Sequence, residues 1–128
     1  MISLTTHGIR ITVSTFYEPD LSRPILQKYV HSYRITIANE SDVVVQLLER
    51  QWYIHDSNGL VRDVQGEGVI GKQPTIEPGQ EHQYISQCPL MTDMGRMYGY
   101  YTMQLVGSEE RIEVDIPEFA LIAPFKRN

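Results

Sequence analysis

Apolar and polar residues alternate along much of this chain with a period of two. The segments 9–14, 33–38 and 112–116 each place an apolar side chain at every second position. Successive side chains of a β-strand point to opposite faces of its sheet, so each segment predicts a strand with one buried face. The third alternation runs into Pro117, and we expect its strand to end there because proline interrupts strand pairing.

Turn signals lie between these segments. Residues 56–59 (Asp-Ser-Asn-Gly) can supply the positive φ angles of a tight hairpin, and residues 77–80 (Glu-Pro-Gly-Gln) fit a type II turn. The segment 44–54 has apolar residues on both faces, which is typical of a central strand, although a short helix fits the pattern too. The predicted strands are seven, at residues 9–16, 28–38, 44–55, 60–65, 81–87, 96–106 and 111–117. Short, regularly spaced strands of this kind indicate an all-β sandwich.

The length and composition are those of one folded domain. At 128 residues the chain fits a single domain, and we treat residues 1–128 as that domain. A chain of this length buries roughly two-thirds of its unfolded surface, so its core needs no metal or disulfide. Hydrophobic residues make up 41% of the chain, and it has no low-complexity tract, which argues against disorder.

The charge argues against one large class of partner. The formal net charge is −5, and the Lys and Arg residues are scattered. Binding to nucleic acid draws its affinity from clustered positive charge, so we expect no nucleic-acid partner. The pair Lys126-Arg127 is the nearest approach to a basic cluster, and we expect it to be a solvated terminus.

Cysteine use and hydropathy predict a cytoplasmic location. Cys88 is the single cysteine, so the chain cannot form an internal disulfide, which suits a reducing compartment. Residues 1–15 contain no continuous apolar stretch of the length that a signal peptide needs. The longest apolar runs, such as residues 120–123, are too short to span a membrane, so we expect no membrane association.

One segment matches a known ligand-binding motif. Residues 66–71 read Gly-Glu-Gly-Val-Ile-Gly, which fits the G-x-G-x-x-G fingerprint of dinucleotide-binding folds. That fingerprint has meaning where a strand precedes it and a helix follows it. Here residues 72–75 (Lys-Gln-Pro-Thr) and the turn at 77–80 follow, and no helix fits them. We therefore expect a loop between strands rather than a Rossmann fold.

Three interpretations of this loop remain open. Its glycines can simply permit positive φ angles in an irregular connection. Its backbone N–H groups can form a nest that holds a phosphate, with Lys72 adding a charge, but Glu67 would repel an anion. Val69 and Ile70 would lie at the tip as two apolar side chains, which suits a protein partner, and of the two binding interpretations we prefer this one. The candidate binding residues of the loop are Gly66, Gly68, Val69, Ile70, Gly71 and Lys72.

A second candidate surface lies in the tyrosine-rich segment 96–104. Tyr98 and Tyr100 share one face of the predicted strand. The other face carries Met97, Tyr101 and Met103, and we expect one of the two faces to be core. If the tyrosine pair is uncovered, it offers the rigid amphipathic surface favoured at interfaces. Ordinary aromatic packing between neighbouring strands is the alternative.

The residues that could catalyse a reaction or bind a metal show no convincing pattern. The four histidines lack metal-ligand spacing, although Asp56 and Asp63 could together make a weak site for a hard cation. Cys88 has no histidine near it in sequence, and a nucleophilic thiol needs a base. The motifs of serine hydrolases, zinc proteases and P-loop proteins do not occur. We therefore predict no catalytic residue, no metal site and no cofactor.

Several segments together resemble the ApaG family, in matching order over nearly the whole chain. They are residues 45–52, 56–59, 64–74, 78–79, 84–86, 89–92, 95–103 and 116–119. The chain resembles the stand-alone bacterial members, with Gln51 and Gln87 as departures from the family pattern. The resemblance implies a fibronectin type III-like or immunoglobulin-like β-sandwich.

The resemblance also carries functional associations. Eukaryotic F-box and polymerase-interacting proteins contain the same domain, which implies a protein-binding role. The bacterial members, also named CorD, are associated genetically with cobalt and magnesium efflux and with diadenosine tetraphosphate hydrolysis. No catalytic residues are established for the family pattern, so the resemblance transfers none to this chain.

These observations favour a non-enzymatic binding module with an unidentified protein partner. Its surface is expected at residues 66–73 and 96–104; a sheet edge that recruits a partner strand and a homo-oligomer are further options. The alternative is a small-ligand sensor in which residues 66–71 hold the phosphate or pyrophosphate group of a nucleotide, with Mg²⁺ or Co²⁺. An enzyme is least favoured, because it needs a histidine or carboxylate beside Cys88 or Tyr84.

Overall fold

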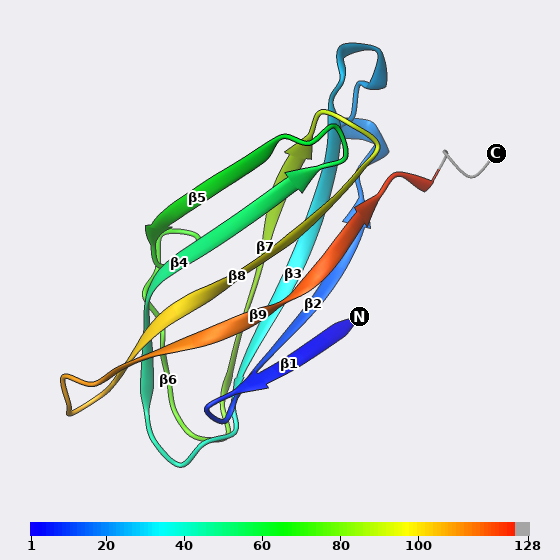
Figure 1. Ribbon diagram of the computed structural model, residues 1–128. Helices are drawn as coiled ribbons and strands as arrows, with labels where there is room; N and C mark the ends of the chain where they lie inside the picture. The colour runs from blue at the N-terminus through cyan, green and yellow to red at the C-terminus, as the bar shows by residue number, and fades with distance from the viewer. Residues whose placement is uncertain (125–128) are drawn as a thin grey trace.

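The computed structural model describes residues 1–124, which form nine strands and two short 3₁₀ turns (Figure 1). The strands are β1 (Ile2–Thr6), β2 (Ile9–Tyr17), β3 (Tyr29–Asn39), β4 (Val45–Asp56), β5 (Val61–Glu67), β6 (Thr75–Ile76), β7 (Glu81–Leu90), β8 (Met94–Leu105) and β9 (Arg111–Ile122). The turns η1 (Pro19–Leu21) and η2 (Pro24–Leu26) connect β2 to β3. Within residues 1–124 no helix has the length and hydropathy needed to cross a membrane. Lys126 and Arg127 fall outside the described residues.

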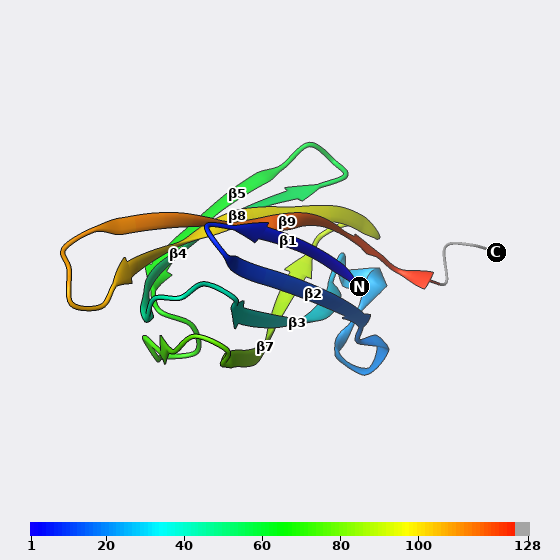
Figure 2. The same cartoon turned by 90° about the horizontal axis from the view of Figure 1, so that it is seen from below.

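The strands form two antiparallel sheets that pack face to face (Figure 2). One sheet has the order β1-β2-β3-β7, and the other has the order β5-β4-β8-β9 with β6 paired to β4. Side chains buried between them include Ile9, Ile11, Ile35, Ile37, Leu47, Met97, Tyr101, Met103 and Leu121. Burial of one such side chain contributes roughly 1.5–3 kcal/mol. The predicted all-β sandwich is confirmed, and its finer likeness to fibronectin type III or immunoglobulin domains stays a prediction.

The prediction of seven strands misses β1 and β6. β1 is an edge strand of five residues, and its apolar alternation consists of Ile2 and Leu4 alone, which are too few to mark a strand. A tight turn joins it to β2, with φ angles of 52° at His7 and 77° at Gly8. Two consecutive positive φ angles match the twist of a hairpin. β6 is only two residues long, too short for a periodic signal.

The prediction that Pro117 ends the last strand is wrong. β9 continues to Ile122, so Pro117 lies inside it. The pairing of β8 with β9 shifts between Met97 and Gly99, which leaves Pro117 in a bulge. A residue in a bulge is left out of the regular hydrogen-bond ladder, so the strand tolerates the missing N–H of proline.

Three other predictions about the chain are confirmed. The hairpin at residues 56–59 is closed by the Gly59 N–H, which donates to the Asp56 carbonyl oxygen at 3.0 Å. The turn at residues 77–80 has Gly79 at φ 83° and a 2.9 Å bond between its ends. The segment 44–54 is a central strand, since β4 pairs with β8 on one side and with β5 and β6 on the other.

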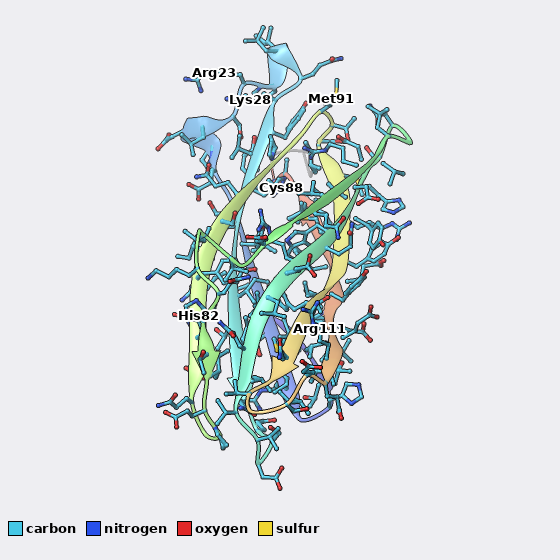
Figure 3. The ribbon with its side chains drawn as sticks, turned by 90° about the vertical axis from the view of Figure 1, so that its left-hand side faces the viewer. Arg23, Lys28, His82, Cys88, Met91 and Arg111 are labelled. Atoms are coloured by element: carbon cyan, nitrogen blue, oxygen red, sulfur yellow. The ribbon has the colours of Figure 1, made fainter. Side chains whose placement is uncertain are left out.

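The two lateral edges of the sandwich differ. On one side β9 packs against β1 and β2 of the opposite sheet, which closes the sandwich. On the other side β5 and β7 are the edge strands of their sheets and do not pair. Figure 3 looks onto this second side, where Cys88 of β7 is labelled. Of the two lateral edges, the one between β5 and β7 is therefore the open one.

Candidate functional site

The glycine motif forms the end of β5 and a tight turn. β5 ends at Glu67. The turn is closed by the Val69 N–H, which donates to the Lys72 carbonyl oxygen at 2.8 Å, and by the reverse bond at 3.0 Å. Between these residues Ile70 and Gly71 have φ angles of 49° and 72°. The short strand β6 comes next, which confirms that no helix follows the motif.

The backbone donors of this turn are largely occupied. The Gly68 N–H donates to the Leu48 carbonyl oxygen at 2.8 Å, and the N–H groups of Val69 and Lys72 donate across the turn. A nest that binds phosphate needs N–H groups that point outward and are free. These three residues therefore have no backbone donor left for a phosphate.

The glycines make room for an arginine and for the turn itself. The Nη1 group of Arg50, on β4, donates to the carbonyl oxygens of Glu67 at 3.0 Å and Gly68 at 2.8 Å. A Cβ on Gly66 would lie 2.9 Å from this guanidinium. A Cβ on Gly68 would lie 2.1 Å from the Lys72 carbonyl oxygen. The spacing that matches a dinucleotide fingerprint therefore serves here to hold Arg50 in place.

Only one of the two apolar residues of the turn is exposed. Ile70 is 59% exposed, as expected for a residue at the tip. Val69 is 1% exposed and packs into the core, so the expectation that it lies on the tip is wrong. The tight turn between Val69 and Lys72 directs the Val69 side chain inward. The loop therefore offers a partner one large apolar side chain instead of two.

The outer face of the β5-β4-β8-β9 sheet carries the predicted tyrosine pair. Met97, Tyr101 and Met103 are buried in the core, which confirms one face of the predicted strand as core. Tyr98 and Tyr100 lie on the opposite face and are half-buried. Their side chains lie on the outer side of the sheet, away from the interior of the sandwich.

Two aromatic residues of β4 join the tyrosine pair. Tyr53 lies opposite Tyr98 in the strand register, and their rings stack with centroids 5.3 Å apart. The ring of His55 also stacks on Tyr98 at 5.4 Å, and its Nε2 lies 3.1 Å from the Tyr98 hydroxyl. We call Tyr53, His55, Tyr98 and Tyr100 the aromatic face. Sequence reasoning missed Tyr53 and His55 because the register between two strands is not visible in either strand alone.

Carboxylates surround the aromatic face. The registers place Asp63 opposite Tyr53 and Asp115 opposite Tyr100. Desolvation raises the pKa of Tyr53, and Tyr100 and Asp63 raise it further. The other carboxylates on this side of the sheet are those of Glu49, Glu67, Glu113 and Glu118. The surface is thus aromatic at its centre and acidic at its margins.

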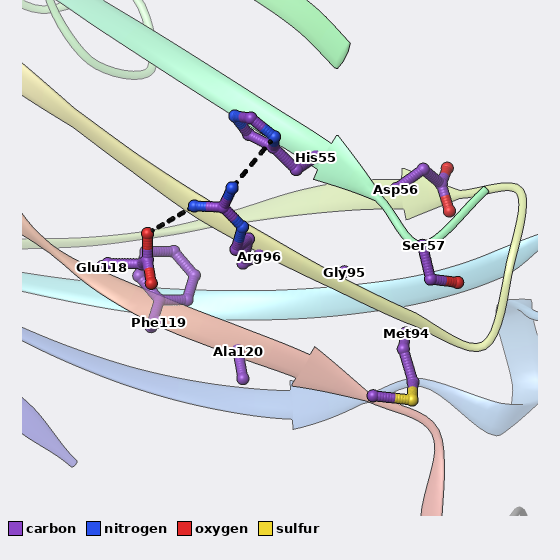
Figure 4. A pocket seen from close by; sticks show the side chains of 9 residues that line it. All are labelled: His55, Asp56, Ser57, Met94, Gly95, Arg96, Glu118, Phe119 and Ala120. Atoms are coloured by element: carbon purple, nitrogen blue, oxygen red, sulfur yellow. Dashed lines mark hydrogen bonds and ion pairs between the residues drawn. The ribbon is translucent and has the colours of Figure 1, made fainter. Parts of the chain in front are cut away.

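A pocket of about 520 Å³ opens at one end of this surface (Figure 4). The Arg96 side chain crosses it, with Nη1 donating to Glu118 at 2.7 Å and Nη2 lying 3.3 Å from the Nδ1 of His55. The Arg96 guanidinium also lies 5.7 Å from the ring centre of Tyr98, in reach of a cation–π interaction. Apolar parts of the lining come from Met94, Phe119 and Ala120. His55 and Arg96 therefore connect the pocket with the aromatic face.

Cys88 has a histidine beside it that the sequence did not reveal. The register of β3 and β7 places His31 directly opposite Cys88, and both are buried. Burial raises the pKa of the Cys88 thiol, although the nearby Arg62 opposes the shift. Burial lowers the pKa of His31. Both shifts favour the neutral forms, whereas an activated cysteine needs a thiolate beside a protonated base.

Tyr84, the other residue considered for catalysis, is a packed core residue. Its hydroxyl bonds to that of Tyr101 at 2.5 Å, and burial is the main cause of its raised pKa. A tyrosine with a raised pKa stays protonated and is a poor general base. The geometry around Tyr84 therefore supports packing rather than proton transfer.

The two aspartates considered for a cation do not converge. Asp56 points inward and accepts hydrogen bonds from the N–H groups of Met91 at 2.8 Å and Thr92 at 3.0 Å. Asp63 lies on the outer face, where it accepts a hydrogen bond from Gln51. In the part of the chain described, no group of three or more His, Cys, Asp or Glu side chains is placed to hold a metal ion.

Comparisons with known proteins agree on one family. The model of the ApaG domain family matches residues 19–105. A Brucella anthropi relative called Protein ApaG is 50% identical over 127 residues, which cover 99% of this chain and 97% of that protein. A Brucella abortus relative with the same name is 46% identical over 128 residues, which cover 99% of this chain and 97% of that protein.

Solved structures support the same comparison. A Bordetella pertussis structure described as an ApaA protein matches with a TM-score of 0.87 at 37% identity, covering 91% of this chain and 94% of that one. A protein of Archaeoglobus fulgidus matches with a TM-score of 0.53 at 11% identity, covering 87% of this chain and 94% of that one. That second likeness concerns the fold alone.

Proposed function

This chain belongs to the ApaG domain family, and we propose that it is a non-catalytic domain that binds a protein partner. The observation that carries the proposal is the aromatic face, four ring side chains that share the outer surface of the β5-β4-β8-β9 sheet. Tyrosine and histidine present an apolar body and a polar edge, a combination enriched at protein interfaces. The pocket beside Arg96 adds a concave margin to this surface.

The charge of this surface defines the partner's chemistry. Six carboxylates stand on the same side of the sheet, and only one, Glu118, forms an ion pair with an arginine within residues 1–124. Complementary charge guides association and disfavours partners of the same sign. The partner segment is therefore basic, with Lys or Arg side chains over the carboxylates and an apolar side chain on the tyrosines. Binding of this kind weakens as salt rises.

The proposal as a non-catalytic domain is supported by the neutral pair His31 and Cys88 and by the packed state of Tyr84. Neither supplies an activated nucleophile or a general base. The association with cobalt and magnesium efflux and the cytoplasmic location stay predictions. So does a homo-oligomer, in which a second copy would have to present a basic segment to this acidic surface.

The test uses a photo-crosslinking amino acid placed in the full chain, expressed in the organism that encodes it. Probes at Tyr100 and at Ile85 sample the aromatic face and the exposed face of the opposite sheet. We expect one discrete adduct from the Tyr100 position, none from the Ile85 position, and a basic segment at the linkage found by mass spectrometry. Equal adducts from both positions, or no adduct from either, would contradict the proposal.

A pair of variants tests the same surface independently. The double change Tyr53→Ser and Tyr98→Ser removes the stacked rings, which lie outside the core. The photo-crosslinking probe is placed at Thr102, beside the altered rings, and we expect the double variant to lose the adduct with the partner. Its circular dichroism spectrum should be unchanged, which shows that the fold is intact. The control change Ile85→Ser removes an exposed apolar side chain from the other sheet and should leave capture intact.

A further inference from the structure

A cleft enters the sandwich between the unpaired edges of β5 and β7 (Figure 3). It consists of two adjoining cavities of about 190 Å³ and 210 Å³. The residues that line both cavities are Tyr33, Arg50, Trp52 and Ser86. Arg62 and Cys88 line the first cavity, and the glycine turn lines the second. We call this space the inter-sheet cleft.

Arg50 is fixed in the cleft with part of its hydrogen-bonding capacity unused. Its Nη1 group donates to the two carbonyl oxygens at the end of β5, at 3.0 and 2.8 Å. A guanidinium has five N–H donors, so Nε and Nη2 retain three. Residues 1–124 give neither of these atoms an acceptor, yet neither is sealed from solvent. Nε and Nη2 lie on the same edge of the guanidinium, the edge that binds two oxygens side by side.

The positive charge of Arg50 has no carboxylate partner among the described residues. Their ion pairs are Arg10 with Glu40 and Arg96 with Glu118, both at the surface. Arg62 is also outside these pairs, and its Nη2 lies 3.6 Å from the Cys88 sulfur and donates to the Pro89 carbonyl oxygen. A charge held between two sheets is costly unless it is paired. The cleft thus contains two arginines, and neither forms an ion pair with a carboxylate of the described residues.

The rest of the cleft suits a small polar group. Tyr33 and Ser86 supply hydroxyl groups, and Trp52 supplies an apolar wall. Glu67 lines the second cavity at the end of β5, where its backbone carbonyl oxygen accepts from Arg50. The register places its side chain opposite Glu49, on the outer face of the sheet, so its carboxylate does not oppose the two arginines. Burial lowers the pKa of His82 on β7, and the positive charge of Lys72, near the same edge, lowers that pKa further. The balance of charge in and around the cleft is positive.

We propose that the inter-sheet cleft binds a small oxyanion, the phosphate or carboxylate group of a small molecule, on the free edge of Arg50. Phosphate and carboxylate share the geometry that a guanidinium binds with two parallel hydrogen bonds. Arg62 adds a second charge at the opening, and the hydroxyls of Tyr33 and Ser86, which bond to each other, leave one O–H to donate. The small size of the cavities favours one anionic group over a whole dinucleotide. This site uses a side chain beneath the glycine turn, which differs from a phosphate nest made by the turn's backbone.

The experiment follows the arginine side chain directly. The full chain, labelled with ¹⁵N, is titrated with inorganic phosphate, with pyrophosphate and with malonate, each at constant ionic strength against sodium chloride. We expect a saturable shift of the Arg50 Nε–H signal and of the Gly66 and Gly68 amides with at least one oxyanion, and no saturation with chloride. The phosphate and malonate arms distinguish the two sources of the anion. Absence of any saturable shift at Arg50 up to tens of millimolar (on the order of the weakest specific affinities) overturns the proposal.

Two variants separate a built site from general attraction. Arg50→Lys keeps the charge and loses the planar fork, so we expect at least a tenfold weaker affinity (about 1.4 kcal/mol). Arg10→Lys makes the same change at a surface arginine and should leave binding unchanged. Equal affinity in Arg50→Lys and the unaltered chain overturns the proposal. The Nε–H measurement is made on the unaltered chain, so the test stands even if Arg50→Lys folds poorly. Tyr98→Ser, which alters the aromatic face, should also leave anion binding intact.

Discussion

The aromatic face and the inter-sheet cleft lie on opposite sides of one strand. β4 directs Tyr53 and His55 outward and Arg50 and Trp52 inward, because successive side chains alternate. On the outer side the arginine that meets the aromatic rings is Arg96, which has a carboxylate partner and water around it. On the inner side Arg50 is held by carbonyl oxygens and has no carboxylate partner in the described chain.

The difference shows how a protein of net charge −5 can offer two opposite electrostatic surfaces. Its acids gather on the outside of one sheet, and two of its arginines lie between the sheets. Packed sheets lie about 10 Å apart, so the two environments are separated by little more than the thickness of a strand. A single overall charge therefore says little about which ligands the molecule can attract.

The largest expected effect comes from a change that damages both regions together. Gly99 of β8 lies against β4, where an added Cβ would sit 1.9 Å from the Gln51 carbonyl oxygen. We expect Gly99→Ala to lower the free energy of unfolding by about 3 kcal/mol or more, because the backbone of β4 must move. Urea denaturation measures the loss, with Thr102→Ala on the outer side of β8 as a control that changes stability by no more than about 0.5 kcal/mol. Equal effects from the two variants would contradict the close approach.

The next effect distinguishes the two sides of β8 with the same chemical change. The hydroxyl of Tyr101 is buried and bonds to that of Tyr84, so Tyr101→Phe leaves a buried hydroxyl without its partner. We expect a loss of about 1–2 kcal/mol in the free energy of unfolding. Tyr100→Phe, one residue away on the outer face, should cost less than about 0.5 kcal/mol. A larger loss in the free energy of unfolding from Tyr100→Phe than from Tyr101→Phe would contradict this expectation.

A third prediction concerns acid, and it acts on the inner side. Burial lowers the folded-state pKa of His31 below 6.5, so the unfolded chain takes up a proton first as the pH falls. Stability contributed by the neutral histidine is complete above pH 6.5 and is lost as the pH falls toward the folded-state pKa. We expect the free energy of unfolding to decline below pH 6.5 and His31→Gln to reduce that slope. His82, whose pKa is also lowered, leaves a residual slope, and an unchanged slope would contradict the assignment.

The smallest effect belongs to the outer ion pair. The side chains of Arg96 and Glu118 are 47% and 54% exposed, so water and salt screen their attraction. We expect Glu118→Gln to change the free energy of unfolding by less than about 0.5 kcal/mol at physiological salt. Thermal unfolding monitored by circular dichroism gives the value. A loss above about 1 kcal/mol would mean that the pair is part of the packed structure.

Sequence periodicity predicted the interior strands because burial on one face imposes a period of two. It missed β1 because the alternation there consists of only two apolar residues, Ile2 and Leu4. It placed the end of β9 at Pro117 because a single strand does not show where its pairing with the neighbour is shifted by one residue. The second error arises because pairing geometry is a property of two strands and is absent from the pattern of one.

The candidate site was predictable to a smaller extent. Tyr98 and Tyr100 were assigned to one face by alternation alone, but their partner rings on β4 required the register. The burial of Val69 depends on the direction of a tight turn, which the composition of the turn does not fix. His31 and Cys88 lie far apart in sequence and meet only through the pairing of β3 with β7. Arg50 was not predicted as a site residue, because its neighbours along the chain do not show which part of the fold its side chain faces.

The closed edge of the sandwich has a consequence for how the protein is made. β9 packs on β1 and β2, so two strands that leave the ribosome early are covered by one that follows about a hundred residues later in the order of synthesis. Until residues 111–122 are synthesised, no strand covers the apolar side chains of β2 on that edge, and the nascent chain exposes them. Contacts between the ends of a chain carry a high entropy cost and slow folding. Truncation before β9 should therefore produce a chain that binds chaperones and aggregates, whereas a chain that includes β9 folds once that strand is released.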